Sequence, residues 1–542
     1  MSTTILDALD AAARTSRGMR FIAPPWPTGT TAPEPERLTY AELRDAAARV
    51  GAALVRRLEA GRPILLILPN GPAVVTTFFG ALHAGLVPSI LNPPRPFADP
   101  STWAEGVARV ARQADDAPVV TSPMLRGLLA KSPAARDLVV IDPAELDAEP
   151  DDPRPHPVAL LQYTSGSLAA PKGVILTHEA VLAEAEGIAE RLGATSSDVG
   201  CFWVPLAHDM GLIGSLAFLL RLGAEQVLMA TEHFAVDPAA WLRATAEHGA
   251  TLLSGPPFGF ELAARRLTKT TRGASPGPPP DLSAIRACVV GAEPIDARVL
   301  RRVSAMLAPT GFREDPWVAA YGLAEYACVA TARVGLETLR VRPVGGIGEP
   351  IQEDPDGLEL VCNGRPLVIG DVRVVGEDGQ PVGERVAGRI QVTGRAAMSG
   401  FWRDLAASNA ALSGPWIVTG DVGFLVDGEL YVSGREKDVI IIHGRHFFPE
   451  EIEHVVQDVP GVRPGCVVAF GVVDPSGGPE RVTLVAEAGK DVDTAALERA
   501  LRERVVDRLD LVVSQVVFVA PRAIPRTTSG KPRRGEARTR FA

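Results

Sequence analysis

The chain has 542 residues, which exceeds the size that one hydrophobic core supports, so we expect about three or four subdomains. Apolar residues make up 46% of the sequence and charged residues 22%, a balance typical of folded globular proteins and not of disordered ones. The formal net charge is -10, and the one basic cluster (residues 531–540) is short, so nucleic acid is not expected as a partner.

The cysteines and the lengths of the apolar runs indicate in which cellular compartment the protein is expected. The five cysteines are scattered, odd in number and form no C-x-x-C pair, so neither a disulfide framework nor a zinc site is predicted. No apolar run reaches about 18 residues, and the N-terminus lacks the pattern of an export signal. We therefore expect a cytoplasmic protein without a membrane span, whose acidic surface mainly aids solubility.

Short apolar runs alternate with helix-length segments over roughly the first half of the chain. Residues 64–68 form a continuous apolar run, and Val75, Phe78, Phe79 and Leu82 follow at the i, i+3, i+4, i+7 spacing of an amphipathic helix. The runs that repeat this alternation are residues 138–141, 158–161, 226–229 and 287–290. The pattern predicts an α/β fold with parallel sheets.

The pattern changes twice in the second half. From about residue 361, short strand-like runs such as 371–375 and 388–392 alternate with turn residues and predict a small β subdomain. After Arg435, helical stripes and two apolar strands (466–473 and 482–486) predict a separate small α+β domain. We expect a large domain over residues 1–434, with its β subdomain at about 361–434, and a small domain over 435–542.

Residues 163–173 read Y-T-S-G-S-L-A-A-P-K-G, between the apolar run 158–161 and a helical segment that starts near His178. Small hydroxyl residues and glycine let successive backbone N–H groups turn inward around an anion, and Lys172 adds a positive charge. A phosphate-binding loop is predicted. An ordinary polar connection is the alternative, but it does not require these hydroxyls together with Pro171 and Lys172. The cradle residues are Thr164, Ser165, Gly166 and Ser167.

Four further motifs follow in order, and each alone has a plain structural interpretation. G-A-E-P-I (291–295) is compatible with a simple strand-to-helix turn, and Y-G-L-A-E (321–325) with a solvated helix charge at Glu325. T-G-D (419–421) with S-G-R-E-K-D (433–438) is a weak pattern. T-T-S-G-K (527–531) alone would be part of a frayed basic tail.

Together, these five motifs resemble those of the adenylate-forming superfamily of acyl-CoA synthetases, peptide-synthetase adenylation domains and luciferases, over about residues 38–535. The resemblance implies a large N-terminal domain of stacked α/β sheets with a small β subdomain, and a small mobile α+β cap. It also implies ATP and Mg2+ as cofactors. Leu168 and Ala169 stand where the superfamily usually has Thr and Gly, a departure within the phosphate loop.

The resemblance assigns roles to individual residues. Glu325 and Thr164 are expected at Mg2+, Asp421 and Arg435 at the ribose, and Lys437 at the hinge of the cap. Lys531 is the expected catalytic residue at the α-phosphate, with His208 and Lys172 assisting. The residues expected around adenine are Gly291, Ala292, Glu293, Pro294, Tyr321, Gly322, Leu323 and Ala324.

Residues 202–214, F-W-V-P-L-A-H-D-M-G-L-I-G, resemble the segment that lines the acyl pocket in this superfamily. The P-L-x-H-D-M-G-L form, G-A-E-P-I, C-N-G-R-P-L (362–367) and P-P-R-P (93–96) look more like fatty acyl-AMP ligases than CoA synthetases. Those ligases pass the acyl group to the phosphopantetheine thiol of an acyl carrier protein, in lipid, polyketide or peptide biosynthesis. The expected pocket residues are Phe202, Met210, Gly211, Gly214 and Phe258.

Two alternatives remain open. Residues 331–360 could supply the segment that in those ligases hinders the domain rotation needed for thioester formation with CoA. This stretch is shorter than usual, so use of CoA stays open. The second hypothesis is therefore an acyl- or aryl-CoA ligase or a stand-alone adenylation enzyme. An inactive nucleotide-binding protein is the third hypothesis. Leu168 and Ala169 favour it, whereas the retained Lys172, Glu325 and Lys531 oppose it.

Overall fold

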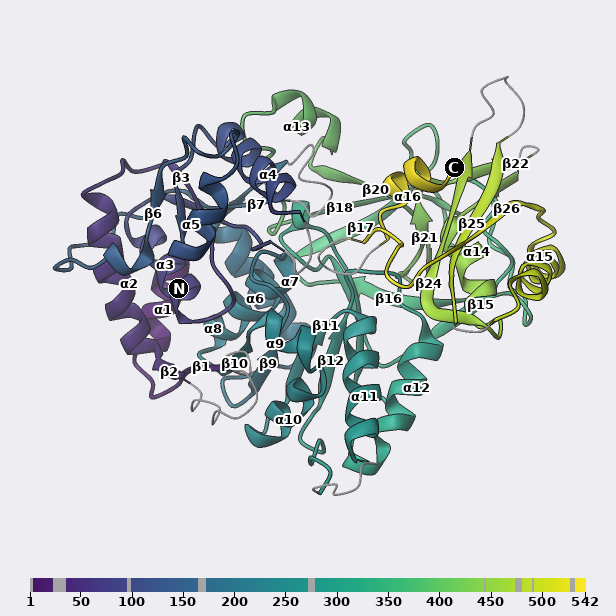
Figure 1. Cartoon of the computed structure of the whole chain (residues 1–542), viewed down its shortest axis with the longest axis horizontal. Helices are drawn as coiled ribbons and strands as arrows, with labels where there is room; N and C mark the ends of the chain where they lie inside the picture. The colour runs from purple at the N-terminus through teal and green to yellow at the C-terminus, as the bar shows by residue number, and fades with distance from the viewer. Residues whose placement is uncertain are drawn as a thin grey trace.

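The computed structural model describes residues 3–22, 36–94, 99–163, 172–271, 278–442, 445–472, 480–489, 492–526 and 532–542. The N-terminal and central parts of the chain form a large α/β body, and the C-terminal segment lies at one end, beside β20 and β21 (Figure 1). Within the described ranges, no helix is both long and apolar enough to cross a membrane.

One large sheet runs through the body and changes character at β13. From β1 to β13 its neighbouring strands are parallel, and beyond β13 they are antiparallel. The strands in spatial order are β17 (Gly370–Val375), β18 (Gly388–Gly394), β20 (Trp416–Val426), β21 (Glu429–Arg435), β16 (Leu358–Pro366), β14 (Thr331–Val334), β13 (Trp317–Tyr321), β12 (Ala287–Val290), β11 (Leu252–Gly255), β9 (Val199–Phe202), β10 (Glu225–Met229), β1 (Gly18–Ile22) and β2 (Glu36–Thr39). The short β15 (Thr338–Val341) and β19 (Leu412–Ser413) pair with β16 and β20.

A second, wholly parallel sheet lies in the N-terminal part of the body. Its order is β4 (Val87–Ile90), β3 (Pro63–Ile67), β5 (Val119–Thr121) and β6 (Val140–Ile141). The predicted strand and helix at residues 64–82 are confirmed as β3 and α3 (Pro72–His83). The predicted parallel pairing is wrong for residues 158–161, because β7 (Val158–Tyr163) pairs antiparallel with β8 (Gly173–Thr177) on the other side of the predicted phosphate loop.

Helices cover both sheets and begin at polar caps. α6 begins after Thr177, whose hydroxyl accepts the Ala180 N–H at 3.1 Å, and ends at Gly193, whose left-handed φ of 56° suits glycine. The other helices of the body are α1 (Ile5–Ala12), α2 (Tyr40–Val55), α4 (Pro100–Gln113), α5 (Pro123–Ala130), α7 (Asp209–Gly211), π-helical η2 (Leu212–Ala217), α8 (Phe218–Leu222), α9 (Thr231–Val236), α10 (Ala239–Glu247), α11 (Pro257–Thr271), α12 (Ala297–Leu307) and α13 (Leu405–Ala411); short 3-10 turns are η1 (Pro143–Glu145), η3 (Ala308–Thr310), η4 (Ala324–Tyr326) and η5 (Glu436–Asp438).

The predicted β subdomain is present as a set of antiparallel strands. The runs predicted at 371–375 and 388–392 are confirmed as β17 and β18. Antiparallel pairing, however, already starts at Thr331, where β14 joins β13. The sequence around residue 331 does not indicate this change of strand direction, because β14 is too short to show an alternating pattern of apolar and polar residues.

The C-terminal segment has its own three-stranded sheet, with β24 (Val462–Val472) antiparallel and β26 (Val513–Val519) parallel to β25 (Arg481–Ala488). The helical stripes predicted after Arg435 include Leu497, Leu501, Val505 and Leu509, and all four are buried on one face of α15. The remaining elements are α14 (Pro449–Val456), α15 (Thr494–Leu509), α16 (Arg534–Phe541) and the hairpin β22 (Ile440–Ile442) with β23 (Arg445–Phe447).

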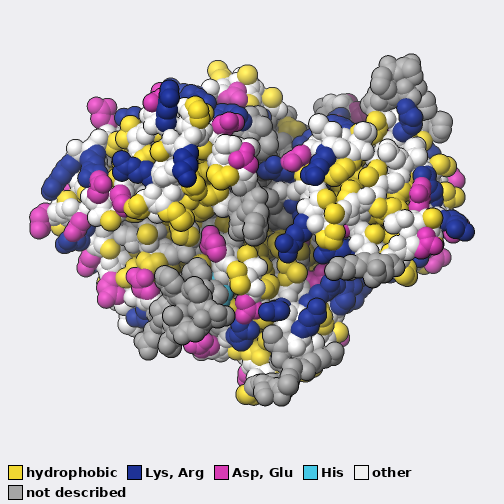
Figure 2. All heavy atoms as spheres, viewed as in Figure 1, with side chains coloured by type: hydrophobic (Ala, Val, Ile, Leu, Met, Phe, Trp, Pro, Cys, Tyr) yellow, Lys and Arg dark blue, Asp and Glu magenta, His cyan; other side chains and the backbone are white. Residues whose placement is uncertain are grey.

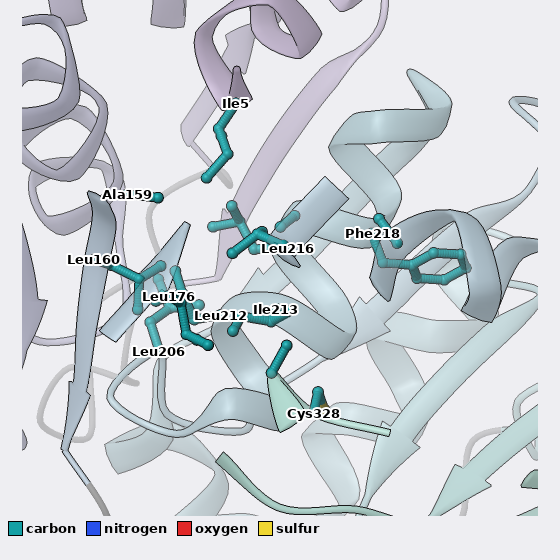
Figure 3. Close-up of a cluster of buried hydrophobic side chains, with 14 of the residues drawn as sticks. Ile5, Ala159, Leu160, Leu176, Leu206, Leu212, Ile213, Leu216, Phe218 and Cys328 are labelled. Atoms are coloured by element: carbon teal, nitrogen blue, oxygen red, sulfur yellow. The ribbon is translucent and has the colours of Figure 1, made fainter. Parts of the chain in front are cut away.

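A continuous hydrophobic core ties the N-terminal helix to the middle of the chain. Figure 3 shows Ile5 of α1 near Leu160 of β7, Leu176 of β8 and the side chains of η2. These side chains are almost fully buried, and truncating one such leucine to alanine typically costs about 2–5 kcal/mol. The core therefore fixes the position of η2 and of α7, which precedes it.

Candidate active site

The carboxyl ends of β11, β12 and β13 lie side by side, because these strands are parallel and in register. Ligands of parallel α/β sheets bind at this edge. The predicted G-A-E-P-I segment follows β12, and the predicted Y-G-L-A-E segment ends β13 and continues beyond it. The fold therefore brings these two motifs to one place.

Gly291 lies at the point of closest approach between the two segments. A Cβ at this position would come within 2.7 Å of the Ala320 carbonyl oxygen, so only glycine fits. Ala292 follows in the left-handed region with φ of 65°, which costs a non-glycine residue about 1–3 kcal/mol and is characteristic of functional sites. Glu293 accepts a 3.0 Å hydrogen bond from the backbone N–H of Phe258, so these two predicted residues lie together.

Tyr321, Asp421 and Arg435 meet at the junction of the parallel sheet and the antiparallel strands. The Tyr321 hydroxyl donates to Asp421 Oδ2 at 2.7 Å, and Arg435 Nε lies 3.2 Å from Asp421 Oδ1. Asp421 is buried with 8% exposure, whereas the Arg435 side chain is half exposed. Burial and the neighbouring Asp421 carboxylate raise the pKa of the Tyr321 phenol well above its usual value. Tyr321 therefore stays a hydrogen-bond donor.

Glu325 lies in the short turn η4 after β13. Burial raises the pKa of its carboxyl, the charges of Asp209 and Asp421 raise it further, and Arg435 acts in the opposite direction. A bound cation would relieve the mutual repulsion of these carboxylates, and oxygen ligands suit Mg2+. Among the described residues, three or more His, Cys, Asp and Glu side chains nowhere form a ready-made metal cluster. The Glu325 carboxylate thus offers an oxygen ligand of the kind that fits such an ion.

His208 stands at the start of α7, where its Nδ1 lies 3.3 Å from the Met210 nitrogen and 2.7 Å from Asp209 Oδ1. These two contacts orient the ring from its Nδ1 side. Gly211 has no room for a side chain, since a Cβ would come within 2.4 Å of the Pro205 carbonyl oxygen. The helix then widens into the π-helical η2, a feature that often occurs at functional sites.

An apolar pocket of about 30 Å3 lies beside these groups. Its floor is formed by neighbouring strands of the large sheet, and α6 with the start of η2 forms the other side. Of the residues predicted for an acyl pocket, Met210 and Gly214 line it, whereas Phe202, Gly211 and Phe258 do not. Phe202 is packed in the core with 1% exposure.

The sequence interpretation missed most of the pocket wall. Ile188, Arg191 and Leu192 come from the last turns of α6, and Val289 and Ala332 from β12 and β14. Arg191 donates to the backbone carbonyl oxygens of Ala332, Arg365 and Pro366, and so joins α6 to β14 and β16. Only the helical spacing of Ile188, Arg191 and Leu192 hinted that they share one face.

Glu184, one turn earlier on α6, does not line the pocket but bonds Val329, which does. It is completely buried, and its Oε1 accepts the backbone N–H of Val329 at 2.6 Å. Burial raises the pKa of this carboxyl well above its usual value. In sequence it resembles a solvated helix charge, so nothing local identifies it.

The remaining predicted residues are placed as follows. Lys172, the residue before β8, lies with its Nζ over the Phe401 ring at 4.9 Å from the ring centroid. Lys437 is exposed in η5, two residues after Arg435. Pro294, Gly322, Leu323 and Ala324 lie in the two segments that follow β12 and β13. The predicted site residues Thr164, Ser165, Gly166, Ser167 and Lys531 lie outside the described residues.

Comparison with known proteins identifies the family of this chain. The family of AMP-binding enzymes matches residues 13–402. A Caulobacter vibrioides protein named as an acyl-CoA synthetase is 33% identical over 93% of this chain and 90% of its own length. The medium-chain-fatty-acid--[acyl-carrier-protein] ligase JamA of Moorena producens is 31% identical over 94% of this chain and 90% of its own length.

A solved structure from a study of fatty acyl-adenylate ligases of E. coli and L. pneumophila has a TM-score of 0.87 and 29% identity, covering 99% of this chain and 97% of that one. The predicted α/β architecture is thereby confirmed. The chain belongs to the family of AMP-binding enzymes, and within it to the adenylate-forming acyl-AMP ligases that its motifs resemble.

Proposed function

We propose that this enzyme activates a fatty acid with ATP as its acyl-adenylate and transfers the acyl group to the phosphopantetheine thiol of an acyl carrier protein. The observation that carries the proposal is the position of the pocket. Ala320 lines it and is followed directly by Tyr321, which bonds Asp421. An apolar chain in the pocket would thus end beside the groups proposed for the nucleotide.

The described residues at the sheet edge have distinct roles in the proposed reaction. The close backbone approach at Gly291 leaves a flat surface for adenine, and Asp421 accepts hydrogen bonds from the ribose hydroxyls. Glu325 would hold Mg2+, which supplies charge neutralisation at the phosphates when bound. His208, oriented through its Nδ1, would present the other ring nitrogen to the acid.

In the proposed step, one carboxylate oxygen attacks the α-phosphorus of ATP, and a P–O bond forms. The bond to the bridging oxygen breaks, and pyrophosphate leaves with its electron pair. Negative charge on the phosphoryl oxygens is offset by Lys531, and Lys172 assists with pyrophosphate, because fixed positive groups stabilise such a transition state.

We further propose the domain division at Arg435, with residues 435–542 turning about Lys437 between the two half-reactions. In support, Lys437 is exposed in a single turn between β21 and the C-terminal hairpin β22–β23. A short turn with few packed side chains can absorb a change of backbone angles.

The carrier protein is proposed over CoA on two grounds. JamA, a relative along nearly the whole chain, is named as a ligase for an acyl carrier protein. Val344, inside the candidate segment 331–360, donates its backbone N–H to Glu451 of α14 at 2.9 Å, and Glu451 is completely buried. Because the proposed turn about Lys437 must break this contact, we propose that docking of a carrier protein can break it and that binding of free CoA cannot. The relative named as an acyl-CoA synthetase favours the second candidate, a CoA ligase.

The acceptor is tested by giving the enzyme ATP, Mg2+, a fatty acid and equal concentrations of a holo-carrier protein and CoA. We expect acyl-carrier thioester as the main product, resolved by mass spectrometry. The apo-carrier, which lacks the thiol, is the matched control. Thioester formed mainly on CoA would establish the second candidate instead.

A further inference from the structure

The C-terminal segment contains a second hollow, of about 400 Å3. It lies between the ends of β24 and β25, the chain at residues 522–526 and α16 (Figure 1). No residue of the apolar pocket lines it, and none of the residues assigned above to the nucleotide or the acid does.

Positive charge dominates this hollow. Five arginines line it against two glutamates, so three positive charges remain uncompensated. The chain as a whole carries a net charge of -10, and Figure 2 shows both signs of charge interspersed over one face of the molecule. A concave surface focuses such a local excess and attracts anions. The arginines are Arg463, Arg522, Arg526, Arg533 and Arg540.

Both glutamates are already engaged by the wall. Glu487 is 2% exposed; its Oε2 accepts from Arg463 Nη1 at 2.8 Å, and its Oε1 from the Arg522 backbone N–H at 2.8 Å. Glu536 accepts from Arg533 Nη1 at 3.0 Å. These contacts hold guanidinium groups in place but use only some of the donors that each one has.

Arg533 has a hydrogen-bond donor that is not satisfied by any described residue. Its Nε is buried and lacks a hydrogen-bond partner within the described part of the chain. Leaving a buried donor atom unpaired is costly, so such an atom is normally satisfied by protein, by ordered water or by a bound ion. The contrast is Arg534, the next residue, which pairs with Glu450 and Glu453 at 2.8 Å outside the hollow.

We propose that this hollow is a binding site for a phosphate group. Guanidinium groups bind phosphate oxygens through paired N–H donors, and several fixed arginines in a concavity suit phosphate better than a single carboxylate. Free phosphate and the phosphate of a pantetheine arm share this chemistry. No described residue that lines the hollow is assigned to the proposed nucleotide site, and the test below measures binding without catalysis, so its outcome does not depend on the proposed function.

The test uses isothermal titration of the full chain with three probes at fixed ionic strength: inorganic phosphate, pantetheine 4′-phosphate, and pantetheine without phosphate. Arg522→Glu and Arg540→Glu change exposed residues of the hollow. Arg538→Glu is the matched control, because it is exposed on the same helix as Arg540 but does not line the hollow. Thermal unfolding of each variant checks that the fold is kept.

We expect the phosphate-bearing probes to bind the unmodified chain and the Arg538 variant with similar affinity. Their affinity for the Arg522 and Arg540 variants should fall by about tenfold or more. Pantetheine alone should not bind. Tighter binding of pantetheine 4′-phosphate than of inorganic phosphate would identify the arm as the source, and equal binding would identify free phosphate. The proposal is overturned if no probe binds, if the hollow variants bind like the unmodified chain, or if the Arg538 variant weakens equally.

Discussion

The Tyr321 hydroxyl donates a 2.7 Å hydrogen bond to Asp421, although the two residues are 100 positions apart in the chain. The bond links the end of the parallel strand β13 to the antiparallel strand β20. Asp421 also lies directly opposite Arg435 in the pairing of β20 with β21. Two regions of different strand direction thus supply one polar cluster at the carboxyl edge of the sheet.

Removing the Asp421 carboxylate tests this cluster. Asp421→Ala should raise the KM for ATP about tenfold to a hundredfold, because a carboxylate that accepts hydrogen bonds from a ligand is lost. Tyr321→Phe, which removes one hydroxyl and keeps the ring, should have a smaller effect. Initial rates of pyrophosphate release over a range of ATP concentrations measure both. Equal KM values in the Asp421 variant and the unmodified enzyme would contradict the assignment.

Glu325→Gln tests the proposed metal residue. Amide oxygen carries no charge and binds Mg2+ more weakly, so we expect the Mg2+ concentration for half-maximal activity to rise about tenfold or more. Titration of activity with Mg2+ at saturating ATP measures this shift. Glu314→Gln, at an acidic position not assigned to the site, is the control. An unshifted Mg2+ curve for Glu325→Gln would remove the residue from the metal site.

Val289 offers a test of the acyl pocket. Val289→Phe adds volume to the wall and should lower kcat/KM for long acids about tenfold or more relative to short ones, whereas Val289→Ala should favour longer acids. Pyrophosphate release with a series of straight-chain acids measures the preference. Activity on the shortest acid shows that the Phe variant remains folded. An unchanged preference in both variants would show that the chain lies elsewhere.

Glu451 makes stability depend on pH. Burial raises the pKa of its carboxyl from 4.5 to about 8, so the folded chain holds a proton that the unfolded chain releases. This contribution is fully present below about pH 4.5 and is lost as the pH rises through about 8. Glu451→Gln should therefore lower the dependence of Tm on pH between pH 5 and 8, as measured by calorimetry. Identical Tm profiles for variant and unmodified chain would contradict this origin.

Local patterns in the sequence were sufficient to predict many elements. The run at 64–68 and the spacing of Val75 to Leu82 predicted β3 and α3, because burial on one side is encoded residue by residue. The run at 158–161 also predicted a strand, but an apolar run is compatible with either direction of pairing. Its antiparallel partner β8 is therefore visible only in the structure.

The candidate site was predictable where chemistry lies in contiguous motifs, as at residues 291–295 and 321–325. The pocket wall was not, because Arg191 and Ala332 come from distant segments that meet only after folding. Glu184 shows the same limit, since an isolated glutamate in a helix carries no local sign of complete burial. Such side chains are defined by tertiary packing and not by the residues beside them.

The most direct test of the account is acid-dependent release of pyrophosphate from Mg-ATP by the purified chain and by its Lys531→Ala variant. We expect pyrophosphate release only when a suitable fatty acid is present. In the variant, the rate of release should fall by about 100-fold or more while ATP binding is kept, because an electrostatic stabiliser is lost. If no acid in a panel of different chain lengths elicits pyrophosphate, or if the variant matches the unmodified enzyme, the proposed reaction is wrong.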